Sequence, residues 1–168
     1  MTEGIVDEPA IPTEAASAEV KPMTEPSAVE IPEQLKSGFR FILVKPKSKE
    51  AFEKGWQETA NYASDDPRLT DHLKKNGNYG VLPTERQLIV DVDRAGLEAG
   101  IDKLLLKKFG RTFTVKTPHG GLHLYYNTDT EQEPQNLPLR DSKTGQNLGH
   151  VKANRGGYTV GPGCSVED

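Results

Sequence analysis

The sequence predicts one domain of mixed α and β structure (α/β or α+β), and three observations support this. The chain has 168 residues, which is enough for one ordinary domain and short for two. Short apolar runs that are typical of strands are separated by segments whose apolar residues recur at helical spacing. No segment of the sequence is repeated.

An acidic leader precedes the predicted domain. Residues 1–33 contain eight acidic groups and one lysine, a net charge of −7, with five of the 12 prolines and no aromatic residue. Such a segment cannot bury enough apolar surface to offset its ordering entropy. We therefore expect a disordered, proline-rich tail over 1–37 and a folded domain over 38–168. The chain beyond residue 33 has a net charge of +3, which does not by itself distinguish a phosphate-binding domain from an ordinary soluble one.

The first half of the domain is expected to contain two strands and two helices. They are, in chain order, a strand over 39–44, a helix over 48–59, a helix over 66–76 and a strand over 78–82. Phe52 and Trp56 lie four residues apart and would share one face of the first helix. Pro67 is typical of the first turn of a helix, and Gly77 follows the end of the second helix.

The second half is expected to contain four strands and one helix. They are a strand over 88–93, a helix over 94–109, strands over 111–116 and 122–126, and a last strand within 156–163, with a loop over 127–149. The helix has apolar residues at helical spacing, and Gly110 stands where a glycine often ends a helix. The turn over 118–121 joins two of the strands as a hairpin.

Several classes of protein are excluded by composition. No run approaches the roughly 18 apolar residues that a membrane span needs, and the first residues lack the basic and apolar regions of a secretory signal. Cys164 is the only cysteine, which rules out an internal disulfide framework and a zinc site made of several thiolates. We therefore expect a cytoplasmic protein without a membrane partner.

Asp91 and Asp93 are the first candidates for chemistry. Side chains alternate between the two faces of a strand, so both carboxylates are expected on the face that carries Ile89. Two carboxylates this close repel each other unless a cation lies between them. Mg²⁺ or Mn²⁺ together with phosphate oxygens would satisfy this arrangement, as in two-metal phosphoryl-transfer sites. The alternative that stays open is an exposed strand end, with Asp93 as the N-cap of the next helix.

A histidine and two cations are the next candidates. His123 is expected on the open face of its strand, beside the two aspartates, where an imidazole could donate to a triphosphate. Gly121 in the preceding turn would let the backbone approach a phosphate closely. Lys152 and Arg155 precede the last predicted strand, which could lie beside the strand that carries the two aspartates. Each of these residues also has an ordinary structural role open to it, as a strand histidine, a turn glycine or a solvated cation.

Four segments in order resemble the primase–polymerase domain of the archaeo-eukaryotic primase superfamily, which occurs on plasmids, viruses and integrated elements. They are FRFILVKP at 39–46, NYGVLP with LIVDVD at 78–93, TPHGGLHLYY at 117–126 and GYTVGPGC at 157–164. Lys49 and Trp56 resemble the lysine and the Gly-Trp segment of the same family. Each motif alone is weak, but four of them in order make a specific resemblance.

The resemblance implies an RRM-like catalytic sheet joined to an N-terminal α/β element. It implies template-directed nucleotidyl transfer by a DNA primase/polymerase in the replication of a plasmid, virus or integrated element. Asp91 and Asp93 would hold Mg²⁺ or Mn²⁺, and His123 would bind the incoming nucleotide with Gly121, Lys152 or Arg155 nearby. The implied partners are nucleoside triphosphates and a single-stranded or primed DNA template, with a replicative helicase as a further candidate.

Two departures from the family pattern leave alternatives open. The family places a third metal-binding aspartate where this chain has His150, so His150 is either a substitute ligand or a surface loop residue. The sequence stops at Asp168, directly after the last motif, which is expected of a minimal or truncated copy or of one that a partner chain completes. The alternative functions are a catalytically degenerate primase-like protein that binds nucleic acid or a replication partner, and an interaction protein without a nucleotide site.

Overall fold

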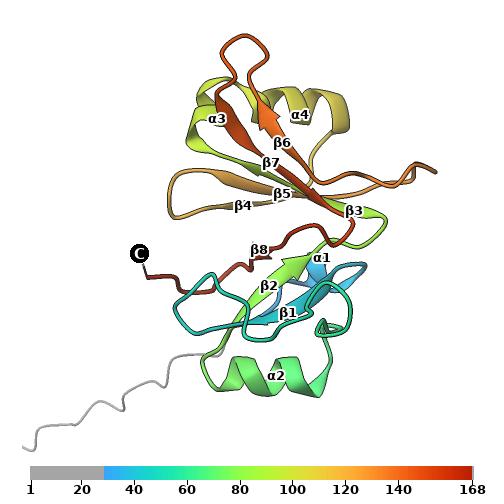
Figure 1. Ribbon diagram of the computed structural model, residues 1–168, viewed down its shortest axis with the longest axis vertical. Coiled ribbons are helices and arrows are strands. Elements are labelled where there is room, and N and C mark those ends of the chain that lie inside the picture. The colour runs from blue at the N-terminus through green and yellow to red at the C-terminus, as the bar shows by residue number, and fades with distance from the viewer. Residues whose placement is uncertain (1–28, 168) are drawn as a thin grey trace, which may run out of the picture.

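The computed structural model describes residues 29–167, and the chain there forms two antiparallel sheets. In Figure 1 the smaller sheet lies in the lower half of the molecule and the larger one in the upper half. The described chain starts in the smaller half, crosses to the larger half at β3 and returns at its end to the smaller sheet. The α+β class that the sequence predicts is therefore confirmed.

The smaller sheet has the strand order β1-β2-β8. Its strands are β1 (Arg40–Val44), β2 (Asn78–Leu82) and β8 (Thr159–Val160), and its helices are α1 (Glu33–Lys36) and α2 (Pro67–Lys74). The Asp66 carboxylate accepts a hydrogen bond of 2.8 Å from the backbone N–H of Arg68, so it caps α2 at the predicted helix start. Leu69 and Leu73 of α2 are buried in the main core.

The larger sheet has the strand order β4-β5-β3-β7-β6, and every neighbouring pair is antiparallel. The strands are β3 (Gln87–Val92), β4 (Phe113–Lys116), β5 (Leu122–Asn127), β6 (Leu137–Arg140) and β7 (Asn147–Ala153). Helices α3 (Arg94–Glu98) and α4 (Ile101–Phe109) connect β3 to β4. Because β5 lies between β3 and β4, these strands make a split βαβ unit, as in RRM-like and ferredoxin-like sheets.

Alternate residues of β3 belong to two different cores. Val90 and Val92 are buried in the cluster that includes Leu97 and Ile101, between the sheet and its helices. Ile89 faces the other way, into the main core that the larger sheet shares with β1 and β2. The larger sheet is therefore covered by helices on one face and by the smaller sheet along part of the other.

The predicted helix over 48–59 is wrong. This segment folds back along β1: the Phe52 N–H donates to the carbonyl of Leu43 at 2.8 Å, and Ala51 forms a bridge with Val44. Gly55 has a φ of +71°, which a regular helix does not contain. Pairing with the preceding strand β1 thus overrides a helix-compatible composition. One four-residue spacing between two aromatic residues is weak evidence for a helix.

Three expectations for the second half are also corrected. The helix over 94–109 is two helices, because Gly100 adopts a φ of +75° between α3 and α4. The expected loop over 127–149 contains β6 and the first residues of β7. The strand beside β3 is β7, whereas the Thr159–Val160 strand joins the smaller sheet.

The described chain packs upstream of the boundary that composition predicts. Ile31 is 9% exposed and Leu35 is fully buried, both in the main core, and α1 lies before residue 38. The greater part of the predicted disordered tail, residues 1–28, lies outside the described residues. Among residues 29–167, the structure contains no helix long and apolar enough to cross a membrane.

Candidate active site

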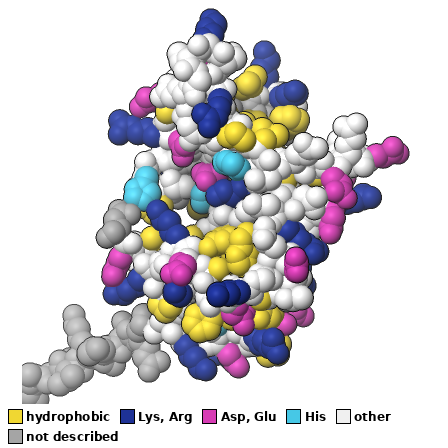
Figure 2. Space-filling view, viewed as in Figure 1, with side chains coloured by type: hydrophobic (Ala, Val, Ile, Leu, Met, Phe, Trp, Pro, Cys, Tyr) yellow, Lys and Arg dark blue, Asp and Glu magenta, His cyan; other side chains and the backbone are white. Residues whose placement is uncertain are grey.

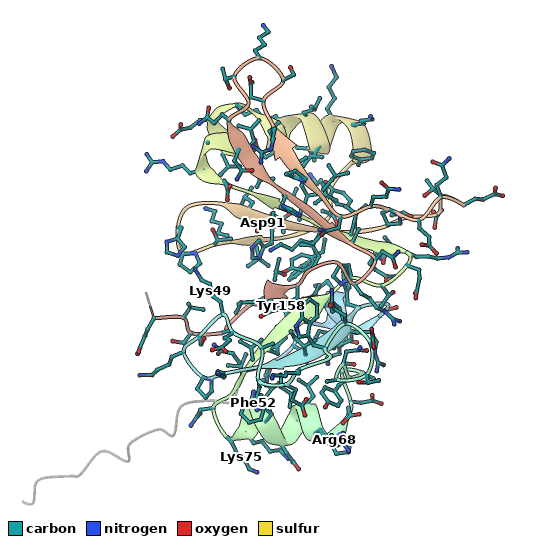
Figure 3. All side chains as sticks on the ribbon, in the orientation of Figure 1. Lys49, Phe52, Arg68, Lys75, Asp91 and Tyr158 are labelled. Atoms are coloured by element: carbon teal, nitrogen blue, oxygen red, sulfur yellow. The ribbon has the colours of Figure 1, made fainter. Side chains whose placement is uncertain are left out.

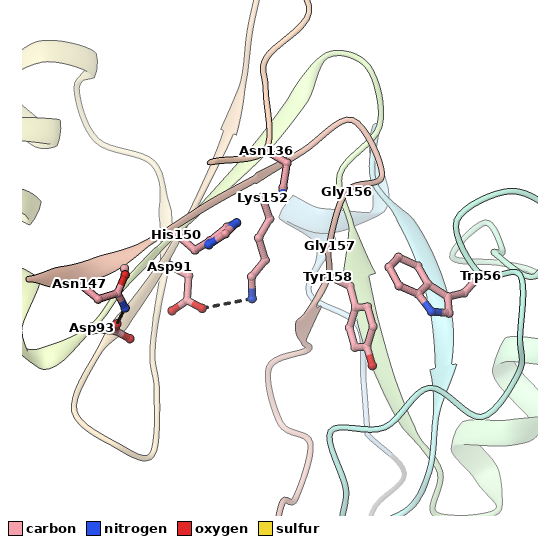
Figure 4. A pocket seen from close by; sticks show the side chains of 11 residues that line it. Trp56, Asp91, Asp93, Asn136, Asn147, His150, Lys152, Gly156, Gly157 and Tyr158 are labelled. Carbon is pink, nitrogen blue, oxygen red and sulfur yellow. Dashed lines mark hydrogen bonds and ion pairs between the residues drawn. The ribbon is translucent and has the colours of Figure 1, made fainter. Parts of the chain in front are cut away.

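Asp91 lies in a row of three polar residues across the larger sheet. The strand register places His123 of β5 directly opposite Asp91 on one side and His150 of β7 directly opposite it on the other. The carboxylate Oδ1 lies 3.5 Å from His123 Nε2, and Oδ2 lies 3.2 Å from the Nζ of Lys152. Figure 4 shows Asp91 with its Lys152 partner and with His150 beside them. The structure thus brings together four of the residues selected from the sequence.

The Asp91 carboxylate is held in its charged form. Its side chain is 25% exposed, and this burial alone would raise its pKa. The hydrogen bond from His123 and the charge of Lys152 outweigh burial and lower the pKa of Asp91 to about 2. A partly buried carboxylate that stays ionised throughout the physiological pH range is a strong ligand for a cation or a developing positive charge.

Asp93 directly follows β3 and occupies the N-cap position of α3. Its side chain makes no capping hydrogen bond to that helix. Instead, its Oδ2 accepts a hydrogen bond of 2.9 Å from the amide Nδ2 of Asn147, at the start of β7. The carboxylate therefore points along the sheet towards the same opening as Asp91, and the interpretation of Asp93 as a simple helix cap is not supported.

The carboxylates lie where two connected lobes of a cleft meet. One lobe, of about 520 Å³, includes Trp56 and His150, and we call it the aromatic lobe. The other, of about 690 Å³, includes Lys49, Lys116 and His119, and we call it the basic lobe. Both lobes share the same four residues at their junction, namely Asp91, Asp93, Lys152 and Tyr158. In Figure 2, histidine, acidic and lysine side chains gather near the middle of this face, above a hydrophobic patch.

A contact between the two halves of the molecule lies in the basic lobe. The Lys49 Nζ lies 3.5 Å from the Nε2 of His119 in the hairpin turn of the larger sheet. In Figure 3 Lys49 lies near the junction of the two halves, as Tyr158 does. A Cβ on Gly121 would lie 2.5 Å from the carbonyl oxygen of Val92, so glycine allows the turn to approach the end of β3. Burial raises the pKa of the Cys164 thiol in this lobe to about 11, so the thiol is not a ready nucleophile.

The sequence matches the family described as "Bifunctional DNA primase/polymerase, N-terminal" (Prim-Pol) over residues 32–168. The chain belongs to this family. Membership indicates a primase/polymerase type of function in DNA replication, with nucleotides and a DNA template as ligands. Divalent metals are the usual cofactors of Prim-Pol domains. A comparison with curated proteins gave no significant match.

The Prim-Pol site of this chain differs from sequence expectation in two places. Arg155 lines neither lobe, and its guanidinium is 3.4 Å from the carboxylate of Glu85. The sequence did not indicate Asn147 as a site residue, although its side-chain amide holds the Asp93 carboxylate. No local signal marks Asn147, because its role depends on the pairing of β7 with β3.

The donor set fits a divalent cation held by few protein ligands. Within residues 29–167 no group of three or more His, Cys, Asp or Glu side chains is arranged to hold a metal ion. Mg²⁺, however, is commonly bound by one or two carboxylates together with substrate phosphates and water. Asp91 and Asp93 offer two carboxylates at one opening. Each carboxylate has further lone pairs that can accept, beyond those used by its present partners. The residues present therefore fit such a cation if substrate completes its coordination.

Proposed function

We propose that this Prim-Pol domain catalyses template-directed nucleotidyl transfer in the cleft beside β3. The observation that carries the proposal is the ionised, partly buried Asp91 carboxylate, flanked by His123 and Lys152 in an opening that also contains Asp93. We assign the activity to a DNA primase/polymerase in the replication of a plasmid, virus or integrated element. That biological setting rests on the family resemblance, whereas the chemistry rests on these side chains.

In the proposed site, Asp91 and Asp93 hold Mg²⁺ or Mn²⁺. When bound there, a divalent cation would supply positive charge that stabilises the transferring phosphoryl group and lowers the pKa of the attacking 3′-hydroxyl. The carboxylates contribute the negative charge that attracts the cation, and Asn147 holds the Asp93 carboxylate in place at 2.9 Å. His150, directly opposite Asp91 on β7, is the proposed third ligand.

The lysines of the cleft and His123 would bind the triphosphate. His123 and Lys152 lie beside Asp91, so they can contact phosphate oxygens at the metal site. Lys49 and Lys116 reach the same lobe from the two halves of the molecule and would neutralise charge farther along the triphosphate. Gly121 also lines the lobe, and its missing side chain lets the hairpin turn pack against the Val92 carbonyl, which places the turn beside the proposed metal site.

A primer-extension assay with Mg²⁺ or Mn²⁺, and with both deoxyribonucleotides and ribonucleotides, tests this proposal. Asp91→Asn and Asp93→Asn should each lower extension by more than about 100-fold, because each removes a charged metal ligand with little change in shape. Asp71→Asn is the matched control, since Asp71 is an exposed residue of α2, far from the cleft. Wild-type extension in Asp91→Asn, with unchanged circular dichroism, would refute the metal-site assignment.

One observation favours a second function, that of a degenerate Prim-Pol domain which binds nucleic acid or a replication partner without catalysis. His150 stands opposite Asp91, where the family resemblance places a third carboxylate. A neutral imidazole is a poor ligand for Mg²⁺, which prefers oxygen. Persistent binding of single-stranded DNA by the wild-type chain, without extension under any of the metal and nucleotide conditions, would establish this second function.

A further inference from the structure

Trp56 and Tyr158 form an aromatic pair inside the aromatic lobe. Their ring centroids are 5.0 Å apart and their planes meet at 81°, an edge-to-face arrangement. Both rings line the same opening as Asp91 and Lys152. Figure 4 shows the pair on one side of the lobe and the carboxylates on the other, with Lys152 between them. A π-surface and a metal-type site thus share one cleft.

Contacts within the half of the molecule that contains the smaller sheet hold this pair in place. The Tyr158 hydroxyl donates to the backbone carbonyl of Lys49 at 2.6 Å. Trp56 packs with the buried cluster of Ile42, Val44 and Leu82 on the smaller sheet, and its own carbonyl accepts from Asn61 Nδ2 at 2.9 Å. Both rings are half-buried, so each keeps part of its surface open to the cleft. An aromatic wall that is already ordered binds a flat ligand at low entropic cost.

The surroundings of the pair match the chemistry of a nucleotide rather than that of an apolar ligand. Lys152 supplies a cation beside the rings, and the amides of Asn136 and Asn147 line the same lobe. Gly156 and Gly157 precede Tyr158 and also line the lobe without side chains. Nucleic-acid grooves that accept any sequence combine cations for the backbone with aromatic rings for the bases.

We infer that Trp56 and Tyr158 form a stacking wall for a base of single-stranded DNA in the aromatic lobe of the cleft. The choice of DNA as the ligand rests on the proposed function. The stacking itself requires neither a bound metal nor catalysis. The base would stack on the open part of the aromatic pair.

Trp56 is the only tryptophan of the chain, so its fluorescence reports on this wall alone. The full chain is titrated in EDTA with an oligothymidylate and, separately, with an abasic oligonucleotide of the same length and charge. Stacking predicts marked quenching of Trp56 emission by the oligothymidylate and little by the abasic chain. Binding of both oligonucleotides with equal quenching, binding without quenching, or no binding of either would overturn the inference.

Substitutions then measure the contribution of the wall. Trp56→Ala should weaken oligothymidylate binding, followed by fluorescence anisotropy of a labelled strand, by about 5-fold to 100-fold, whereas Trp56→Phe should retain most of the affinity. Phe52→Ala is the matched control: Phe52 lies in the same loop, is 57% exposed and contacts His72 of α2 instead of the cleft. Equal affinities for Trp56→Ala, Phe52→Ala and the wild type would refute the wall.

Failure of the stacking wall and failure of the proposed function give different results in these measurements. A chain that fails to extend primers but shows base-dependent quenching refutes the enzyme and retains the stacking wall. A chain that extends primers, loses extension in Asp91→Asn and shows no base-dependent quenching retains the enzyme and refutes the wall.

Discussion

The two faces of the larger sheet use the same strands for different purposes. On the helix-covered face, Val90, Val92 and Leu124 are all buried among apolar side chains of α3 and α4. On the opposite face the same strands are divided along their length. Ile89 and Tyr125 are buried against the smaller sheet. Two residues away on the same strands, Asp91 and His123 line the cleft, and His150 lies opposite Asp91 on β7.

This comparison shows how a small domain can combine a stable sheet with a charged site. Hydrophobic burial on the helix-covered face supplies stabilisation that does not depend on the cleft. The cleft face carries a charge that burial alone would disfavour, and a cation within the sheet compensates it: Lys152 lies 3.2 Å from Asp91. Stability and chemistry are therefore expected to respond to different substitutions.

The largest effect on folding is expected on the helix-covered face. Leu124→Ala removes a side chain that is 6% exposed and should lower the free energy of unfolding by about 2–4 kcal/mol through the lost burial and the cavity. Urea unfolding measures this effect. Leu137→Ala is the control, because Leu137 of β6 is 43% exposed. Similar losses in the two variants would show that this face is not the stabilising one.

A smaller effect, with a characteristic pH dependence, is expected on the cleft face. The folded-state pKa of Asp91 is lowered from 3.8 to about 2, so its charge stabilises the fold above about pH 4, and this stabilisation is lost as the pH falls towards 2. Asp91→Asn should therefore lower the free energy of unfolding by about 2 kcal/mol at pH 7. The difference from the wild type should disappear near pH 2.

Urea unfolding from pH 7 to pH 2 measures this difference, with exposed Asp71→Asn as the control, for which we expect a change in the free energy of unfolding of less than about 0.5 kcal/mol. A gain in stability for Asp91→Asn at pH 7 would mean that repulsion between Asp91 and Asp93 dominates. Two neighbouring carboxylates alone would predict such a gain. We expect a loss of stability instead, because the Asp91 charge is paired with Lys152.

The smallest effect concerns His150 and depends on the proposed metal site. His150→Asp places a third carboxylate opposite Asp91, so the metal-free protein should melt at a lower temperature because like charges repel. Mg²⁺ should reverse this loss at a concentration about tenfold lower than the wild type requires for a comparable shift.

A thermal-shift titration with Mg²⁺ measures this, and His150→Asn serves as a neutral control of similar size to aspartate. Superimposable Mg²⁺ titrations for His150→Asp and His150→Asn would show that His150 does not stand in a metal site. It would then be a structural residue of β7, and the cleft face would carry one site residue fewer.

The sequence by itself determined the features that depend on local periodicity. Alternation along 88–93 was enough to separate Asp91 from Val90 and Val92, because side chains of any strand alternate between its faces. The start of α2 after Asp66 and the end of α4 at Gly110 were predicted in the same way, since capping involves neighbours in the chain.

Only the tertiary structure decided which strands lie side by side and what faces the cleft. Residues 48–59 have a helix-compatible composition, yet they pair with β1 and deliver Trp56 to the aromatic lobe. β7 rather than β8 lies beside β3, which brings His150, Lys152 and Asn147 to the carboxylates. The side-chain contacts of β7 with Asp93 and Asp91 join residues 54 and 61 positions apart. Their free energy depends on burial and pairing that no local pattern encodes.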